Sequence, residues 1–412
     1  MNAITKRQEM LKVFDTRQVF NELMAALSMA LDMDARGKLY HAWRVALVAG
    51  LTAELMLPDK VNDVFYAGLL HDIGAMGLDD HIVHQMISGE PLTDPIILEH
   101  SDRGAAIVKE LPVLAEAALY ILEHHEHWDG TGTPAGRKGP DLTVGGQIVA
   151  VADQLDILLR LYPRDEGKKA LEIIKKRSGT SLMPEVVEAF LAAVAETPYY
   201  QKVQNYNALP SLMEEALNKL PPISCVHPQP FKATVRVFAK IIDAKHKYTA
   251  GHSHRVAAYG VKLAEEIGYG EDQLEELEIA GLLHDFGKIS VPNRILDKAG
   301  PLDEDEFAVI RAHPGRTAEL LNMIEGLKHL AWIAAGHHER YDGRGYPLKL
   351  AGEEIPLGAR ILCIADAFDA MTSNRSYQRN RSFEEAGEVI KKYAGSQFDP
   401  ELAKAAEVLW KQ

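Results

Sequence analysis

Cysteine is nearly absent from this 412-residue chain, which contains only Cys225 and Cys363. Two cysteines so far apart in sequence argue against a disulfide framework and fit a reducing cytosol. The chain also lacks long hydrophobic runs. The longest, at residues 44–57, is interrupted by Glu54 and is far shorter than the roughly 20 apolar residues of a membrane-spanning helix. The N-terminal residues carry charges throughout, so no signal peptide is expected, and we predict a cytoplasmic protein with no membrane segment.

An excess of positive charge is the third absence. Lysine and arginine number 45 against 59 aspartates and glutamates, which makes the formal net charge −14. Such a balance argues against binding polymeric nucleic acid through a broad basic face. It leaves room for a small anionic ligand held by metal ions and a few cations. The length suits two domains, and the apolar fraction of 47% is that of an ordinary globular protein.

What the chain does contain is an internal repeat of phrases rich in histidine and aspartate. The segment "EHHEHWDGTGTP" at 123–134 returns as "GHHERYDGRGYP" at 336–347, and the dyad beginning at His71 returns at His284 (284 − 71 = 213). The same shift of 213 residues relates further pairs, and a shift of 211 relates the last of them: His100 and His313, His124 and His337, Asp153 and Asp366, His41 and His252. Repetition at one spacing predicts two copies of a single module.

Hydrophobic periodicity predicts that both copies are helical. Apolar residues recur at spacings of three and four, as in Leu274, Leu277 and Gly281 before His284. Residues 382–395 open with a capping-box pattern and close on glycine, and no convincing strand alternation is present. Four prolines lie within 221–230, which is typical of a linker. We therefore predict an all-α fold of two tandem helical bundles, with domains at 1–205 and 232–412 and a linker at 206–231.

The repeated polar residues of the second copy predict a metal centre: His252, His284, Asp285, His313, His337, His338 and Asp366. A lone histidine on an apolar helix face is more often a core residue, but five imidazoles and two carboxylates in repeated order favour metal binding. They are too many for one four-ligand zinc site and suit two ions that share Asp285. Nitrogen and oxygen donors without thiolate favour Fe or Mn, with Zn or Ni as alternatives. Two such ions, about 3.5–4 Å apart, activate a water for phosphoryl displacement.

Two details refine this prediction. Neighbouring His337 and His338 can converge on one target only where a helix ends, and the glycines at 343 and 345 supply that ending. Lys288 lies three residues after the His-Asp dyad. It is either a solvated charge near a helix end or a contact to a phosphate above the metals.

The second copy resembles the HD-GYP family of phosphodiesterases, a branch of the HD metal-dependent phosphohydrolases. The resemblance covers roughly residues 232–412 and is carried by "HDFGKISVPNRIL" (284–296), "HP" (313–314), "HHERYDGRGYP" (337–347) and "ARILCIADAFDAMTSNRSY" (359–377). It implies an all-helical HD domain with two or three metal ions, often iron. It also implies hydrolysis of cyclic di-GMP to pGpG and often onward to GMP, whereas some members act on hybrid cyclic GMP-AMP.

The resemblance also implies residue roles. The first metal would be held by His252, His284, Asp285 and Asp366, and the second by Asp285, His313, His337 and His338. Lys288 would contact the scissile phosphate, while Tyr346 and Arg375 would bind substrate. Family members thought to hold a third metal have glutamate where this chain has Tyr248, so we expect two metals. Gln378 stands where some members have a basic residue.

The first copy retains every ligand position, which makes it a candidate second metal site: His41, His71, Asp72, His100, His124, His125 and Asp153. Its surroundings differ, because Ala75 replaces the lysine and Thr133 replaces the tyrosine of the "GYP" turn. Three alternatives stay open for this copy: a metal-loaded regulatory module without catalysis, a working hydrolase with another substrate, and a metal-free structural relic.

The resulting expectation is a cytoplasmic cyclic di-GMP phosphodiesterase with its catalytic module at the C-terminus. The alternatives are a phosphodiesterase for hybrid cyclic GMP-AMP, a general HD nucleotidase, and a sensor that binds a cyclic dinucleotide without cutting it. The "GYP" turn counts against the nucleotidase, and the complete ligand set with Lys288 counts against the sensor. Duplicated helical modules often pack against each other or dimerise, and the sequence fixes neither, so homodimerisation stays open.

Overall fold

The structure is a computed structural model of the whole chain, and it describes most of the sequence. The described residues are 16–34, 37–76, 78, 81–88, 95–111, 114–163, 167–196, 199–220, 230–245, 251–298, 300–373 and 381–411. Three residues considered above, Cys225, Tyr248 and Arg375, lie outside these ranges, as does Gln378.

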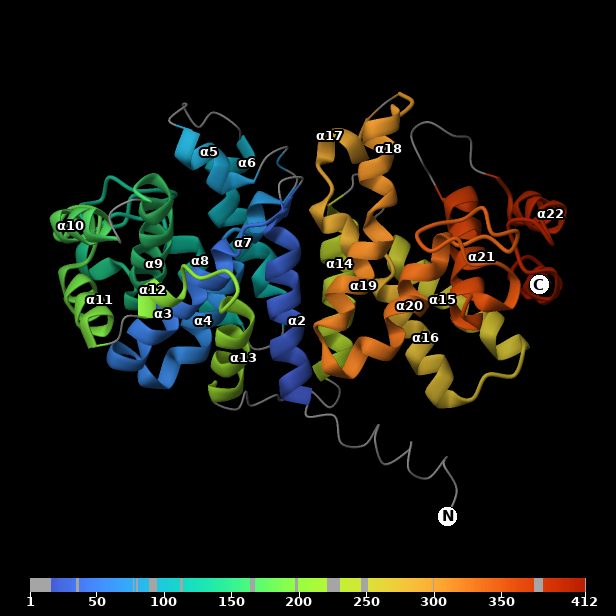
Figure 1. Cartoon of the computed structure of the whole chain (residues 1–412), viewed down its shortest axis with the longest axis horizontal. Helices are drawn as coiled ribbons and strands as arrows, with labels where there is room; N and C mark the ends of the chain where they lie inside the picture. The colour runs from blue at the N-terminus through green and yellow to red at the C-terminus, as the bar shows by residue number, and fades with distance from the viewer. Residues whose placement is uncertain are drawn as a thin grey trace, which may run out of the picture. The chain divides into compact units, whose positions relative to one another are not determined.

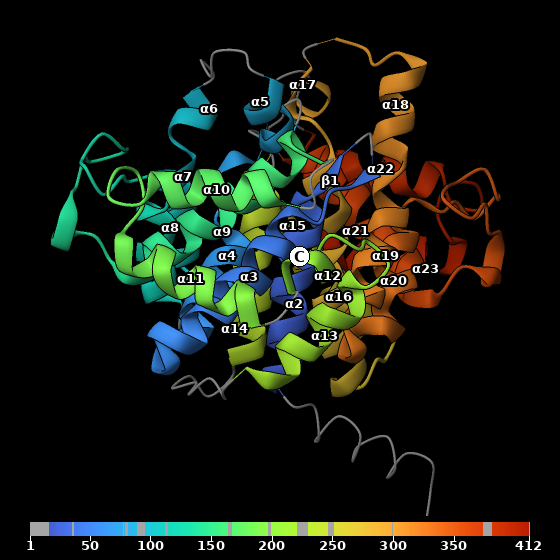
Figure 2. The same cartoon turned by 60° about the vertical axis from the view of Figure 1, so that its left-hand side comes forward.

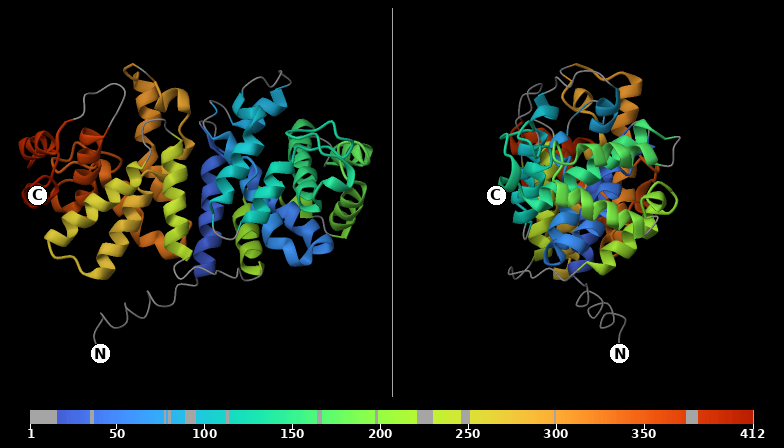
Figure 3. Two further views of the ribbon diagram at one scale, coloured as in Figure 1. Left: turned by 180° about the vertical axis from the view of Figure 1, so that it is seen from behind. Right: turned by 90° about the vertical axis from the view of Figure 1, so that its left-hand side faces the viewer.

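The chain divides into two compact units, Met1–Pro230 and Phe231–Gln412. Within the described residues both units are built almost entirely of helices (Figures 1 and 3). The prediction of an all-α fold is confirmed. One short antiparallel pair of strands was not predicted: β1 (Met33–Asp34) pairs with β2 (Gly37–Lys38) just before the first ligand candidate, His41.

The first unit contains these helices: α2 (Thr16–Leu31), α3 (His41–Met56), α4 (Val61–Leu70), α5 (Ile82–Ser88), α6 (Pro95–Leu98), α7 (His100–Lys109), α8 (Ala115–Glu123), α9 (Val144–Leu161), α10 (Lys168–Arg177), α11 (Pro184–Glu196), α12 (Tyr199–Lys202) and α13 (Leu209–Lys219). Short 3-10 turns join them: η1 (Pro58–Lys60), η2 (Ile73–Ala75) and η3 (Gly139–Asp141). Helix α3 packs against α4 and α9, and α10 and α11 both contact α9 (Figure 2).

The second unit repeats this plan with these helices: α14 (Pro230–Ala244), α15 (His252–Glu266), α16 (Glu271–Leu283), α17 (Asn293–Leu296), α18 (Glu304–Arg311), α19 (His313–Asn322), α20 (Ala331–Ala335), α21 (Leu357–Thr372), α22 (Phe383–Lys392) and α23 (Pro400–Ala405). Its 3-10 turns are η4 (Phe286–Ser290), η5 (Glu325–Leu330), η6 (Gly336–His338), η7 (Gly352–Glu354) and η8 (Ala406–Leu409). Helix α15 packs against α16 and α21, as α3 packs against α4 and α9.

A glycine at the same place in each copy brings two helices together. A Cβ atom on Gly281 of α16 would lie 2.9 Å from the Cα of Ala257 on α15. A Cβ atom on Gly68 of α4 would lie 2.8 Å from the Cα of Ala46 on α3. Both spacings are too short for a side chain, so only glycine permits this approach. The close packing fixes the His-Asp dyad at the end of α4 and α16 against the first residue of α3 and α15.

Helix α13 lies within the range that the sequence analysis assigned to a linker. It packs against α2 and α3, and the side-chain amide of Asn21 donates a hydrogen bond to the carbonyl of Leu217 over 3.1 Å. The capping box at the start of α22 is confirmed, because Ser382 Oγ accepts from the Glu385 backbone amide and the Glu385 carboxylate accepts from the Ser382 amide. Across the described residues, every helix is too short or too polar to cross a membrane.

Candidate metal centres

The second unit brings all seven ligand candidates of its copy together, and we call them the second-copy centre. Six of them lie at the starts or ends of helices, and the seventh lies inside a helix. His252 and His313 are the first residues of α15 and α19, and His284 with Asp285 directly follow α16. His337 and His338 lie in η6, where α20 has ended, as predicted for a pair of adjacent ligands. Asp366 comes from the middle of α21.

These side chains form two groups around one carboxylate. His252, His284 and Asp366 offer ligand atoms within 4.8 Å of one another, and so do His313, His337 and His338. The Asp285 carboxylate lies between the groups. Its Oδ2 is 3.6 Å from His252 Nε2 and 3.4 Å from His284 Nε2, whereas its Oδ1 is 3.3 Å from His313 Nε2 and 3.8 Å from His337 Nε2. One oxygen therefore faces each group, as a bridging ligand requires.

The orientation of the imidazoles is set by hydrogen bonds on their outer nitrogens. Nδ1 of His284 donates to the carbonyl of Gly281 over 2.7 Å, and His313 and His337 donate from Nδ1 to Ile310 and Ala334 at the same distance. A proton on Nδ1 leaves the lone pair on Nε2, which points into the centre. Histidines that bind metals are held by such contacts to their second nitrogen.

The nitrogen and oxygen atoms that point into the second-copy centre are better suited to bind metal ions than to form hydrogen bonds with one another. Among the described residues, His284 Nε2 and Asp285 Oδ1 are buried without a hydrogen-bond partner, which is costly unless a ligand satisfies them. His313 Nε2 and His337 Nε2 lie 3.5 Å apart, although both carry lone pairs when Nδ1 holds the proton. Burial and the neighbouring His284 lower the pKa of His337 to about 3, so its ring is neutral and available as a ligand at neutral pH.

Lys288 and Tyr346 border the second-copy centre. Lys288 Nζ donates to Asp285 Oδ2, so the lysine contacts the carboxylate that faces both groups. Burial alone would raise the pKa of Asp285, but the charges of His284 and Lys288 hold it well below its usual value. The Tyr346 ring stacks on His338 with the ring centres 4.8 Å apart. The third substrate candidate, Arg375, lies outside the described residues.

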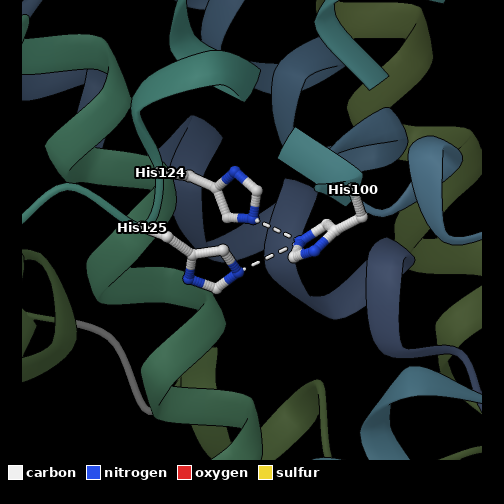
Figure 4. A group of neighbouring side chains, drawn as sticks. All are labelled: His100, His124 and His125. Carbon is white, nitrogen blue, oxygen red and sulfur yellow. Dashed lines mark hydrogen bonds between the residues drawn. The ribbon is translucent and has the colours of Figure 1, made fainter. Parts of the chain in front are cut away.

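The first unit brings together the seven corresponding residues, which we call the first-copy centre. His41, His71 and Asp153 form one group, and His100, His124 and His125 form the other. Figure 4 shows His100 facing both neighbouring histidines, with its Nε2 atom 3.3 Å from that of His124 and 3.1 Å from that of His125. Burial, followed by the charges of His71 and His100, lowers the pKa of His124 to about 3.

Asp72 occupies the same intermediate position in the first-copy centre. Its Oδ2 lies 3.5 Å from His41 Nε2 and 3.3 Å from His71 Nε2, and its Oδ1 lies 3.5 Å from His100 Nε2. Within the described residues, the buried Asp72 Oδ2 has no hydrogen-bond partner. The donor set of the first-copy centre therefore fits metal ions, as the donor set of the second-copy centre does.

The rim of the first-copy centre is apolar where the second copy has a lysine. Ala75, at the position of Lys288, is 8% exposed and belongs to a buried cluster with Ile82 and Val83 of α5 and Ile157 of α9. Helix α5 packs against α9. At the position of Lys288, the described residues of the first copy therefore offer no cation to a phosphate.

Two pairs of supporting residues were missed by the sequence analysis. Asp369 Oδ2 accepts from His252 Nδ1 over 2.7 Å, and Asp156 Oδ2 accepts from His41 Nδ1 over 2.7 Å. The sequence carried a signal for this pair, because each aspartate follows a ligand aspartate by three residues and the two are related by the shift of 213.

The second missed pair is Glu339 and Glu126, the acids that follow the His-His pairs. The Glu339 carboxylate accepts from the backbone amides of Leu348 and Leu350 over 2.6 and 3.1 Å. The Glu126 carboxylate accepts from the amides of Ala135 and Arg137 over 2.6 and 3.0 Å. These acids hold the turn that carries Tyr346 in the second copy and Thr133 in the first.

The fold and the two donor sets together define a tandem pair of helical domains, each with converging side chains that could hold metal ions. The family model described as "HD domain" matches residues 21–186 and 236–402. The chain belongs to the HD domain family, as an HD-GYP type phosphodiesterase with a divergent HD copy at its N-terminus. The sequence-based identification of this family is confirmed.

Two relatives match both copies, and a third matches less than half of the chain. The chain is 30% identical to "3'3'-cGAMP-specific phosphodiesterase 3" of Vibrio cholerae, with 94% of this chain and 95% of that protein covered. It is 29% identical to "3'3'-cGAMP-specific phosphodiesterase 1" of the same organism, covering 89% of this chain and 85% of that protein. "Cyclic di-GMP phosphodiesterase response regulator RpfG" of Xanthomonas campestris is 38% identical over 42% of this chain and 47% of its own length.

A solved structure also matches both copies of the chain. A crystal structure of a cyclic GMP-AMP specific phosphodiesterase of V. cholerae is 27% identical and matches with a TM-score of 0.64. The match covers 94% of this chain and 97% of that chain.

Proposed function

We propose that this protein is a metal-dependent phosphodiesterase that hydrolyses 3'3'-cyclic GMP-AMP in its C-terminal copy. The proposal rests on the position of the Asp285 carboxylate. Its two oxygens face different histidine groups, and Lys288 contacts it. The relatives named for cyclic GMP-AMP support the substrate, because two of them match 94% and 89% of the chain.

This substrate differs from the first expectation, which was cyclic di-GMP. Relatives named for cyclic di-GMP match a much smaller part of the chain, as with 42% for the Xanthomonas protein and 38% for a Thermotoga maritima protein. The findings therefore favour the alternative over the main expectation. Cyclic di-GMP becomes the second candidate substrate, and both candidates contain two phosphodiester linkages in one ring and at least one guanine base.

Two divalent ions are proposed for the second-copy centre, where they would supply positive charge and an activated water to the phosphate. His252, His284 and Asp366 would hold one ion and His313, His337 and His338 the other, with Asp285 contributing to both. Iron and manganese suit these nitrogen and oxygen donors, with zinc and nickel as alternatives.

The protein's own residues would position the phosphate and accept its developing charge. The ammonium group of Lys288 lies on Asp285, where it would donate to a non-bridging phosphate oxygen as negative charge increases. The Tyr346 ring would lie beside the sugar or base, because it stacks outside His338. Water adds to phosphorus, the bond to the 3′ oxygen breaks, and that oxygen takes up the proton. The product is a linear dinucleotide.

For the first-copy centre we propose metal binding without phosphodiester cleavage. Its donors converge as in the second copy, with the buried Asp72 Oδ2 left without a hydrogen-bond partner among the described residues. Ala75 and Thr133 stand where catalysis would need a lysine and a tyrosine. The metal-loaded module without catalysis is therefore the alternative that we carry forward.

The test uses the full chain loaded with Mn or Fe and incubated with 3'3'-cyclic GMP-AMP, cyclic di-GMP and GMP, followed by chromatography. We expect a linear dinucleotide from cyclic GMP-AMP at a higher kcat/KM than from cyclic di-GMP. Preferred cleavage of cyclic di-GMP would overturn the substrate, and cleavage of GMP alone would identify a nucleotidase. Binding of cyclic GMP-AMP without product would identify a sensor. The Asp285→Ala chain provides the inactive control.

A further inference from the structure

We propose that Arg311 binds the second phosphate of the cyclic dinucleotide, the one that is not being cut. This inference rests on the proposed function. Arg311 is the last residue of α18, two positions before His313 of the second-copy centre. Its guanidinium carbon lies 4.9 Å from the centre of the Tyr346 ring. The resulting stack runs from the metal-ligand candidate His338 through Tyr346 to Arg311.

A second aromatic ring lies against the same guanidinium. Phe307, one helical turn earlier on α18, has its ring centre 5.6 Å from the Arg311 guanidinium carbon. Phe307 is 46% exposed, so its ring lies at the surface together with the guanidinium group. Cation–π contacts hold an arginine by its flat face. The N–H groups along the edge of the guanidinium then stay available for a ligand.

The guanidinium of Arg311 has no acidic partner within the part of the chain that the structure describes: its contacts there are the two rings. Several other cations of the second unit are paired with acids. Arg340 contacts Asp342 over 2.7 Å, Arg360 contacts Asp399, and Lys298 contacts Glu306 on α18 itself. An exposed arginine that is positioned by aromatic rings and left unpaired beside a metal centre is suited to bind an anion.

A phosphodiester is the anion that fits. The planar guanidinium fork binds two phosphate oxygens at once. A cyclic dinucleotide carries two phosphodiesters, and Lys288 with the metal centre serves the one being cut. The net charge of the chain, −14, repels a dianionic substrate, so local cations must offset the repulsion. Arg311 supplies such a cation beside the Tyr346 ring, which stacks on His338 of the centre.

The first copy lacks this arrangement as well as the lysine. The positions that correspond to Arg311 and Tyr346 by the shift of 213 are Leu98 and Thr133. Leu98 is 58% exposed, so no packing requirement keeps a leucine there. The copy that lacks Lys288 therefore lacks the arginine and its aromatic support as well, which is expected if all three serve the same ligand.

The experiment compares Arg311→Gln and Arg311→Lys with Lys328→Gln in the metal-loaded full chain. Lys328 is a surface residue paired with Glu325, so its variant loses the same charge away from the centre. The substrates are 3'3'-cyclic GMP-AMP, cyclic di-GMP and bis(p-nitrophenyl) phosphate, which has a single phosphate. Binding of these cyclic dinucleotides and of cyclic di-AMP is measured in the Asp285→Ala background and in the unmodified chain.

We expect Arg311→Gln to raise KM for both cyclic dinucleotides by about 10-fold or more, because a charged hydrogen-bonded contact is lost. The KM of Arg311→Lys should lie between those of Arg311→Gln and the unmodified chain, since lysine keeps the charge but lacks the planar guanidinium fork. In Arg311→Gln, the rate of bis(p-nitrophenyl) phosphate hydrolysis and the amount of bound metal should be unchanged. Lys328→Gln should have the same KM values as the unmodified chain. Binding of cyclic di-AMP should weaken in parallel with the others.

Two outcomes would overturn the role of Arg311. Unchanged KM and binding in Arg311→Gln would remove it from the substrate site. Weaker binding of guanine-containing ligands with unchanged binding of cyclic di-AMP would assign it to a base instead of a phosphate. The proposed function fails separately, if the unmodified chain cleaves no cyclic dinucleotide. Binding then still decides the role of Arg311, and a chain that binds no cyclic dinucleotide would contradict both proposals.

Discussion

Nδ1 of His252 lies 2.7 Å from Oδ2 of Asp369, and both side chains are buried. Arg255 Nε donates to the other oxygen of the same carboxylate. Burial alone would raise the pKa of Asp369, but the hydrogen bonds from His252 and Arg255 lower it to about 2. The carboxylate is therefore ionised at neutral pH, keeps the proton on Nδ1 and directs Nε2 of His252 toward Asp285 and Asp366.

Asp369→Asn is expected to weaken metal binding in the second-copy centre by about 10- to 100-fold, the usual cost of losing such a supporting carboxylate. An amide removes the charge that stabilises the Nδ1 proton and lets the ring turn. Competition titration with a chelating dye measures the affinity. The matched variant is Asp156→Asn, which should weaken the first-copy centre and leave dinucleotide cleavage intact. Unchanged affinity in both variants would contradict the role of these hydrogen bonds.

Lys288→Gln should lower kcat for cyclic GMP-AMP by about 100- to 1,000-fold, as is typical when a donor to a developing oxyanion is removed. The metal content should be retained, because Lys288 is not among the proposed ligands. Single-turnover rates with metal analysis on the same sample make the comparison. Ala75→Lys in the first copy is the control, and it should confer no cleavage in an Asp285→Ala chain because Thr133 is still no tyrosine. An unchanged kcat in Lys288→Gln would show that the lysine is only a solvated charge.

Asp285→Ala and Asp72→Ala should separate the two centres. Each loses the carboxylate that faces both histidine groups, so each should lower the number of metal ions bound per chain. We expect turnover to disappear in Asp285→Ala and to persist in Asp72→Ala. Elemental analysis and chromatography of products measure the two effects. Full metal content in Asp72→Ala would favour the metal-free relic, and loss of cleavage there would show that the first copy is needed for activity.

Gly287→Ala should disrupt the second-copy centre, because a Cβ atom there would lie 2.1 Å from the carbonyl oxygen of His313 and 2.8 Å from the Thr317 amide. Both neighbours belong to the backbone of α19, so the loop with Asp285 and the helix with His313 must separate. We expect a loss of about 1–3 kcal/mol in unfolding free energy and a loss of bound metal. Gly315→Ala is the control, since a Cβ atom at Gly315 meets nothing within 4 Å. Normal metal binding in Gly287→Ala would contradict the close approach.

Lys245 should make the stability of the protein increase with pH. Burial, with the nearby charge of Arg316, lowers the pKa of Lys245 to about 7, whereas the unfolded chain keeps this lysine protonated up to about pH 10.4. Between these values the unfolded state binds more protons, so raising the pH favours the folded state, by at most about 1.4 kcal/mol per pH unit.

The measurement is the unfolding free energy of the unmodified chain and of Lys245→Met from pH 7 to 9. The difference between the two should change with pH in the direction that favours the unmodified chain at higher pH. Lys240→Met, on the exposed side of the same helix, is the control. Parallel pH profiles for the unmodified chain and Lys245→Met would contradict the prediction.

Much of each centre could be predicted from the sequence, because the ligand residues repeat at a constant shift. The pairing of His337 with His338 at a helix end followed from local backbone geometry, and the structure places both in η6. The supporting aspartates were within reach of the same comparison, since Asp156 and Asp369 also repeat. Their role was missed because a spacing of three residues places each of them beside its ligand aspartate on the helix. That spacing does not show which histidine nitrogen the aspartate contacts.

The sequence by itself determined that the chain is helical, that it carries two copies of one module, and that both copies keep a full set of histidine and aspartate donors. Local periodicity and identical spacing carry that information. Only the tertiary structure decided that the Asp285 oxygens face different histidine groups, that Ala75 joins an apolar cluster, and that Arg311 lies on Tyr346. These contacts join elements that are separate in sequence. Their geometry depends on how the helices pack against each other and not on the spacing of residues along the chain.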